Sequence, residues 1–159
     1  MTTHELETMQ QDDPGGPRYT IYHSTRFAFS PAYPHFLKGK AEMIESGHGW
    51  GWTDWKDEGL EVIYVRDNTE HSKGQVIASS VFRPNEELSY FWIEMTTVSK
   101  EYRGQGLYQF MHKHYEKLAK VRGIRKISAT VQIDNIATIK ARTSVGFKTT
   151  MLTMDKIIK

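Results

Sequence analysis

The chain has 159 residues, a formal net charge of +2 and no cysteine. This length suits one domain with its own core. The lack of cysteine excludes disulfides, thiolate metal sites and a cysteine nucleophile, and the scattered histidines predict no metal site. The small net charge gives no argument for nucleic acid. No stretch has the roughly 18–20 apolar residues of a membrane span, and no secretory signal pattern is present, so we expect a cytoplasmic protein without a membrane partner.

The N-terminal part divides into an arm and the start of a folded domain. Residues 1–16 are poor in apolar side chains and end in an Asp-Asp-Pro-Gly-Gly run, which predicts a flexible arm. We expect a single domain over 17–159. Within it, residues 18–23 predict a short strand and 34–46 predict one or two short helices. Residues 47–59 are rich in glycine and tryptophan and predict a loop.

Three strand candidates follow. Residues 61–66 and 75–83 are rich in β-branched side chains, and 88–98 form a long aromatic segment. Short polar turns separate the three. Neighbouring strands joined in this way favour an antiparallel meander.

The pattern then changes from strand to helix. After Gly106, apolar residues recur at helical spacing until Gly123, which is typical of a helix end. Residues 126–133 predict a strand, Asn135 caps a second helix that ends at Gly146, and 147–158 predict a last strand. A strand–helix–strand crossover makes its two strands parallel. The sequence therefore predicts an α/β (α+β) fold with a mixed, mostly antiparallel sheet and helices on its faces.

A candidate anion site lies at the start of the first long helix. Gly104 and Gly106 allow a tight turn and leave no Cβ in the way of a ligand, and Arg103 can add a charged contact. Main-chain N–H groups at a helix N-terminus favour phosphate. No Lys-Ser or Lys-Thr pair follows, which excludes a nucleotide triphosphatase loop, and the acidic residue expected of a dinucleotide site is missing.

Two segments together resemble a known family. The segment Val98-Ser-Lys-Glu-Tyr-Arg-Gly-Gln-Gly-Leu107, with Asn135 and then Gly146-Phe147 downstream, is similar to the signature of the GNAT superfamily of N-acetyltransferases. The resemblance implies that acetyl-CoA is the co-substrate and that the parallel strand pair is splayed apart.

The resemblance also implies a set of cofactor-binding residues. The pyrophosphate would lie on main-chain amides of the loop that comprises Arg103, Gly104, Gln105, Gly106, Leu107 and Tyr108. The pantetheine arm would pair with the strand at Thr96, Thr97 and Val98, where a bulge would splay the strand from its neighbour. Asn135 would contact the same arm, and a main-chain N–H near Val98 would stabilise the oxyanion as an amine attacks the thioester.

Two residues depart from the family pattern. Tyr108 stands where the loop signature has glycine or alanine. Arg142 stands where many members have a tyrosine that protonates the departing CoA thiolate. Arginine is a poor general acid because its pKa is above about 12. Arg142 is therefore expected to stabilise the thiolate or to bind a CoA phosphate.

The general base is expected on the long strand. By alternation, Glu94 shares one face with Tyr90, Trp92 and Thr96. Glu94 can accept a proton from an ammonium substrate, and Tyr90 is the reserve candidate. The alternative is that Glu94 is a structural carboxylate.

The sequence leaves the acceptor open. A small amine, a protein N-terminus and a lysine side chain are all compatible with acetyl transfer. Trp50, Trp52 and Trp55 line the acceptor site or serve core packing or a dimer contact. The basic run within 113–126 is a solvated helix face, or part of its charge faces a phosphorylated ligand. Together with Arg142, this run supports a rival function, the modification of a nucleic-acid base or another unusual acceptor. Arg142 supports another rival, a CoA-binding or partner-binding module without turnover. Since 147–158 supply a single final strand where many members have two, a homodimer that completes the substrate side is a further alternative.

Overall fold

The computed structural model describes residues 3–10, 17–47, 59–69 and 71–158. In chain order its strands and helices are β1 (Thr3–Gln10), β2 (Pro17–Ser24), α1 (Ala32–Glu45), β3 (Glu61–Asp67), β4 (Val76–Asn85), β5 (Tyr90–Val98), α2 (Leu107–Val121), β6 (Lys126–Ala129) and α3 (Ile136–Ser144). Short 3-10 turns at Phe27–Phe29 and Lys100–Tyr102 precede α1 and α2.

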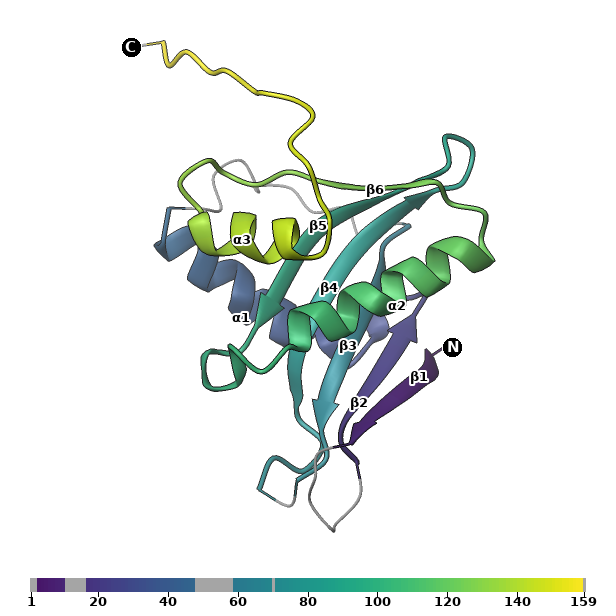
Figure 1. The fold of residues 1–159 in the computed structure, drawn as a ribbon. Helices are drawn as coiled ribbons and strands as arrows, with labels where there is room; N and C mark the ends of the chain where they lie inside the picture. Colours follow the sequence, from purple (N-terminus) through teal and green to yellow (C-terminus); the bar gives the residue numbers. More distant parts are fainter. Residues whose placement is uncertain (1–2, 11–16, 48–58, 70, 159) are drawn as a thin grey trace.

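The six strands form one sheet in the order β1-β2-β3-β4-β5-β6 (Figure 1). Each of the first five pairs with its neighbour in antiparallel orientation, so the predicted meander is confirmed. β5 and β6 pair in parallel, because α2 carries the chain back across the sheet between them. The mixed, mostly antiparallel sheet is therefore as the sequence predicts.

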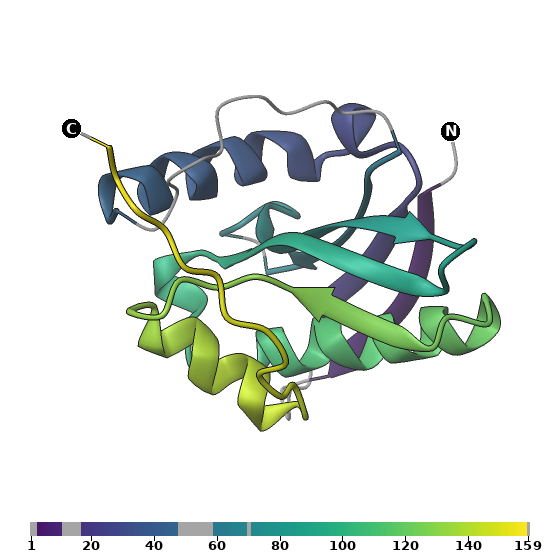
Figure 2. The ribbon, with the colours of Figure 1, turned by 90° about the horizontal axis from the view of Figure 1, so that it is seen from above.

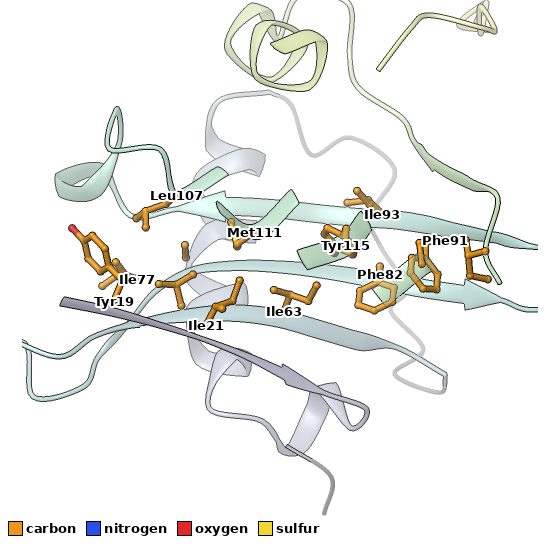
Figure 3. Packing of buried hydrophobic residues seen from close by; sticks show 14 residues of the cluster. Tyr19, Ile21, Ile63, Ile77, Phe82, Phe91, Ile93, Leu107, Met111 and Tyr115 are labelled. Carbon is orange, nitrogen blue, oxygen red and sulfur yellow. The ribbon is translucent and has the colours of Figure 1, made fainter. Parts of the chain in front are cut away.

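Helices cover both faces of the sheet. Figure 2 shows α1 on one side and α2 and α3 on the other. The apolar stripe of α2, at Leu107, Met111 and Tyr115, is buried against the strands (Figure 3). Each such side chain stabilises the fold by about 1.5–3 kcal/mol when it leaves water. On the opposite face, Phe36 of α1 packs in a second cluster with Met95 of β5.

The predicted flexible arm is wrong for residues 3–10. These residues form β1, which pairs with β2 from Thr3 opposite Ser24 to Gln10 opposite Pro17. Hydrogen bonds between main chains need no apolar side chains, so a polar segment can extend the sheet at its edge. Residues 11–16 lie outside the described part of the chain.

The predicted last strand over 147–158 is also wrong. Phe147 packs against the core beneath α2, and the chain then leaves the sheet, as the yellow segment of Figure 1 shows. β6 ends at Ala129 and is thus shorter than predicted. Among the described residues, the tail over 148–158 pairs with no strand. Its apolar side chains are exposed, at Met151, Leu152, Met154, Ile157 and Ile158.

Candidate functional site

The loop between β5 and α2 presents free main-chain amides. Gly104 has φ +75° and Gly106 has φ +79°, so both adopt the left-handed conformation that glycine allows. Gly106 is the N-cap of α2, and no side chain caps the helix start. The first helical hydrogen bond runs from Phe110 N–H to Gly106 O, at 2.9 Å. The N–H groups of residues 107–109 precede that bond and can therefore bind an anion.

Side chains of the loop hold it in place. Arg103 Nε donates to Val98 O at 2.9 Å, and Nη2 of the same side chain lies 3.8 Å from Oε2 of Glu42 on α1. The hydroxyl of Tyr19, on β2, donates to Gln105 Oε1. Arg103 thus ties the loop to the end of β5, and Gln105 ties it to β2.

The parallel strands part halfway along β5. β5 pairs with β6 from Tyr90 to Ile93, opposite Lys126 to Ala129, and the described β6 ends there. From Glu94 onward, β5 keeps β4 as its partner on one side only. The main chain of Glu94–Val98 therefore has an open edge toward the space between the strands, as the resemblance implies.

The open edge includes a main-chain donor at its end. Ser99 N–H donates to Ile77 O at 2.9 Å and so points toward β4. Successive N–H groups of a strand point to opposite edges, so Val98 N–H points toward the open side. This is the group that the resemblance assigns to the oxyanion.

A β-bulge lies at Glu94. Val81 of β4 is opposite Met95, whereas the next residue, Phe82, is opposite Ile93. Glu94 is thus an extra residue on β5. The bulge expected at Thr96–Val98 is therefore placed wrongly, since it occurs two residues before Thr96.

The bulge changes which side chains share a face. Before it, Phe91 and Ile93 face the α2 core, and after it Met95 faces the α1 core. Thr96 consequently faces α2, where its Oγ1 lies 2.6 Å from Ser80 Oγ. The prediction that Thr96 shares a face with Glu94 is wrong, because alternation along one strand cannot reveal an inserted residue.

Glu94 faces the α1 side of the sheet. Its Oε1 lies 3.6 Å from Arg83 Nε on β4, and Arg83 is opposite Trp92. Burial raises the pKa of Glu94, and the neighbouring Arg83 opposes the rise. A half-buried carboxylate with a raised pKa is suited to accept a proton near neutral pH. Tyr90, the reserve candidate, lies on the same face by alternation in the regular part of β5.

Asn135 is confirmed as the N-cap of α3. Its Oδ1 accepts a hydrogen bond from Thr138 N–H at 3.3 Å. The side-chain oxygen therefore stabilises the helix start. The predicted contact with the pantetheine arm stays a prediction.

The two residues that depart from the family pattern lie together. Arg142 is 7% exposed, and its Nη1 donates to Thr130 O at 2.8 Å. Tyr108, in the first turn of α2, interacts with the same guanidinium: burial raises the pKa of Tyr108, and Arg142, as a charge and a hydrogen-bond partner, opposes the rise. The sequence singled out both residues but gave no sign that they meet.

His35 was not predicted from the sequence. This α1 residue bridges two serines, with Nδ1 2.9 Å from Ser79 Oγ on β4 and Nε2 3.0 Å from Ser99 Oγ after β5. Burial lowers the pKa of His35 to about 4. The imidazole is therefore neutral at pH 7 beside the end of the open edge. No sequence signal marks it, because its partners are distant in the chain.

Three further expectations concern the tryptophans, metal binding and membrane spans. Trp50, Trp52 and Trp55 lie outside the described residues. Among the described residues, no three histidine, aspartate or glutamate side chains gather into a metal-binding group. In the same part of the chain, no helix has the length and apolar character that crossing a bilayer requires.

Several solved structures have the same fold. An integron cassette protein from the mobile metagenome of V. cholerae is 15% identical, with a TM-score of 0.63 over 91% of this chain and 94% of that chain. An aminoglycoside acetyltransferase from an uncultured soil metagenomic sample is 9% identical, with a TM-score of 0.67 over 89% and 97%. An aminoglycoside N-acetyltransferase solved with CoA is 12% identical, with a TM-score of 0.59 over 87% and 98%. These likenesses concern the fold.

The sequence itself gives the family. No curated protein matches the chain. A sequence model of the acetyltransferase (GNAT) family, however, matches residues 19–147, which include both the glycine loop before α2 and the open edge of β5. The chain therefore belongs to the GNAT family of acetyltransferases.

Proposed function

We propose that this acetyltransferase moves an acetyl group from acetyl-CoA to a primary amine, which attacks the thioester directly in a ternary complex. One juxtaposition carries the proposal: the open edge at Glu94–Val98 continues into the loop that leads to the free amides in the first turn of α2. Arg103 holds the two together through its 2.9 Å hydrogen bond to Val98 O. A ligand with a pyrophosphate at one end and an amide-bearing arm at the other fits both features.

Each part of acetyl-CoA has a proposed partner. The pyrophosphate binds the amides of residues 107–109, where the helix dipole also favours negative charge. The pantetheine amides pair with the free edge of β5, with Asn135 on the other side of the opening. With the pyrophosphate at the loop beside Val98, the thioester end of the arm lies toward Glu94, where a main-chain N–H of the open edge donates to the oxyanion that forms on the thioester carbonyl.

Glu94 is proposed as the general base. Its side chain lies on the α1 face of the sheet, whereas α2 packs on the other face. An amine can therefore approach Glu94 from the α1 face while CoA binds on the α2 side. Glu94→Gln should lower kcat by about 100-fold or more and remove the acidic limb of the pH profile. The exposed Glu101→Gln is the matched control. An unchanged pH profile in Glu94→Gln would exclude Glu94 and move attention to Tyr90.

The acceptor is proposed as an amine of a small molecule or of a protein. Two of the solved structures with this fold are aminoglycoside acetyltransferases, so an acceptor panel should include aminoglycosides beside simple amines, peptides with a free N-terminus and lysine peptides. Release of CoA thiol from acetyl-CoA is the readout. Amine-dependent release supports the proposal. Firm acetyl-CoA binding with no release for any amine contradicts turnover.

A second candidate is a CoA-binding module without turnover. The observation that favours it is Arg142 in the position of the family tyrosine, since a guanidinium does not donate a proton at neutral pH. The amine panel separates the candidates, because a module binds acetyl-CoA and releases no thiol.

A homodimer and a cytoplasmic location also belong to the proposal. The exposed apolar side chains of the tail after Phe147 are compatible with a second copy. Light scattering should give twice the chain mass for the full protein and a single chain mass for a variant that ends at Lys148. A single mass for both excludes the dimer. Cell fractionation tests the location.

A further inference from the structure

A cavity of about 390 Å³ opens beside the start of α1. Its walls come from residues 25–29, which lead into α1, and from Gly59 and Leu60, which lead into β3. Phe27 and Leu60 are each 1% exposed and give the cavity an apolar base, whereas the ring of Phe29 is 67% exposed. The volume lies at the lower end of the range for small-molecule sites, so the cavity fits one small apolar group.

The cavity adjoins the strand that carries Glu94. A Cβ built on Gly59 would lie 3.5 Å from Arg83 Nη1 on β4. Arg83 Nε in turn lies 3.6 Å from Glu94 Oε1 on β5. The series Gly59, Arg83 and Glu94 thus leads from the cavity across two strand spacings, which is about 10 Å. One amino acid with a large side chain can bridge this distance between the cavity and the proposed base.

Glu94 and Arg83 present opposite charges side by side. Their side chains are 23% and 43% exposed, so a ligand can reach both. A free α-amino acid carries an ammonium and a carboxylate on one carbon atom, and these charges match the carboxylate of Glu94 and the guanidinium of Arg83. A guanidinium suits a carboxylate because its N–H groups can meet both oxygens. A peptide N-terminus, a lysine side chain and a simple amine lack the neighbouring carboxylate.

The rim of the cavity adds a second positive charge. The guanidinium carbon of Arg26 lies 4.4 Å above the ring of Phe29. Of the described residues that line the cavity, Arg26 is the one with a charged side chain. A polycation such as an aminoglycoside is repelled from this rim. An apolar ring, by contrast, gains contact with Phe29 when it enters.

We propose that the acceptor is a free α-amino acid with a large apolar side chain, such as phenylalanine. The side chain fills the cavity, the ammonium meets Glu94 and the carboxylate meets Arg83. The inference rests on the proposed acetyl transfer and names the acceptor of that same site.

The proposed step is balanced in atoms and electrons. The α-ammonium gives one proton to Glu94, and the neutral nitrogen then forms a bond to the acetyl carbonyl carbon. The carbon–sulfur bond breaks, and its electron pair stays on sulfur. The nitrogen loses a second proton, and the sulfur takes up one proton from solvent. The products are an N-acetyl amino acid and CoA thiol, with one proton released overall.

The first test compares acceptors by release of CoA thiol from acetyl-CoA. Phenylalanine is set beside phenylalaninamide and phenethylamine, which have the same ring without the carboxylate, and beside glycine, which has the carboxylate without the ring. The kcat/KM for phenylalanine should exceed that for each of the others by about tenfold or more, since each lacks one charged hydrogen bond or one buried ring. At neutral pH the amide has more unprotonated amine, so intrinsic reactivity alone gives the opposite order.

Variants of Arg83 test the carboxylate contact. Arg83→Met should reduce the ratio of phenylalanine to phenethylamine from about tenfold to near one, and Arg83→Lys should recover part of it because the positive charge returns. The exposed Arg125→Met is the control and should keep the full ratio.

Variants of Phe29 test the cavity. Phe29→Ala should reduce the ratio of phenylalanine to glycine by about fivefold or more, because the ligand ring loses apolar contact. Leu88→Ala is the matched control, since Leu88 is also 67% exposed and lies outside the cavity lining. Equal ratios in the two variants would contradict the placement of the side chain in the cavity.

A binding measurement gives a second readout that needs no turnover. Phenylalanine is titrated by calorimetry into the protein loaded with CoA, which has no acetyl group to transfer. One site should appear on the unmodified chain, and Arg83→Met should weaken it by about tenfold.

The outcomes distinguish the inference from the proposal on which it rests. Phenylalanine binding without CoA release for any amine overturns the transfer and supports the amino-acid site. Release with phenylalaninamide or phenethylamine as fast as with phenylalanine overturns the inference and leaves the transfer standing. Release with lysine peptides, with neither binding nor release for phenylalanine, has the same meaning. An equal loss for phenylalanine and phenethylamine in Arg83→Met would show that Arg83 only supports Glu94 and would overturn its assignment to the carboxylate.

Discussion

Replacing Gly39 with alanine tests how closely α1 packs onto β5. Gly39 is buried in the middle of α1, against Thr97. A Cβ at Gly39 would lie 2.7 Å from Thr97 Oγ1, 2.8 Å from its Cγ2 and 3.0 Å from its Cβ. These distances are too short for carbon contacts, so either the helix or the strand must move.

The expected change is the difference between two opposing effects. Overpacking of a tight contact costs about 1–3 kcal/mol. Alanine in place of glycine in a helix contributes about 1 kcal/mol of stability. The net result for Gly39→Ala is a loss of about 1 kcal/mol, which lowers the Tm by about 2–4 °C for a chain of this size.

Thermal unfolding of five proteins measures both effects: the unmodified chain, Gly39→Ala, Ala41→Gly, Thr97→Ala and the double variant Gly39→Ala/Thr97→Ala. The exposed Ala41→Gly in the same helix gives the helix contribution alone. Gly39→Ala in a Thr97→Ala background should be neutral or stabilising, because two of the three crowding atoms are gone. Acetyl-CoA affinity should fall more in Gly39→Ala than in Ala41→Gly, since Thr97 lies on the open strand. A Gly39→Ala protein that gains the full helix contribution would refute the close packing.

Two further predictions concern pH and charge. In the folded chain the pKa of His35 is about 4, against 6.5 ordinarily, so the stabilisation from its neutral imidazole is present above pH 6.5 and is lost as the pH falls toward 4. Between pH 6.5 and pH 4 the free energy of unfolding of His35→Gln should therefore fall less than that of the unmodified protein, by up to about 3 kcal/mol, as unfolding curves at the two pH values measure. Arg122 donates to both carboxylate oxygens of Glu61, at 2.9 and 2.8 Å, and helps to hold the pKa of Glu61 below its ordinary value. Arg122→Met should therefore cost about 3–5 kcal/mol at pH 7, with a smaller difference in acid where Glu61 is protonated, whereas the exposed Arg125→Met should change little. Equal pH slopes for His35→Gln and the unmodified protein, or equal losses for the two arginine variants, contradict these assignments.

Local patterns predicted the parts of the fold that depend on local chemistry. The apolar stripe from Leu107 identified α2, and Asn135 identified the start of α3 because a cap acts within one helical turn. The parallel pair followed from the length of the crossover between β5 and β6. The tight turn at Gly104 and Gly106 before α2 was recognisable because its glycines and its helix are adjacent in the sequence.

Features that depend on pairing between distant segments were not predictable. The bulge at Glu94 exists only in the register between β4 and β5, and it moved Thr96 to the opposite face. β1 forms because its main chain meets the edge of β2, although its composition is that of a flexible arm. The bridge from His35 to Ser99 joins segments that are far apart in the sequence.

The most direct test of acetyl-CoA binding uses two glycines at opposite ends of α2. Gly106 and Gly123 have φ of +79° and +69°, and neither has an atom within 4 Å of a built Cβ. Valine at either position therefore strains the main chain without a clash. Calorimetric titration with acetyl-CoA should show one site on the unmodified chain and on Gly123→Val, and an affinity at least about tenfold weaker for Gly106→Val. No binding to the unmodified chain at millimolar acetyl-CoA, or equal affinity for all three proteins, would contradict the proposal that CoA binds at this loop.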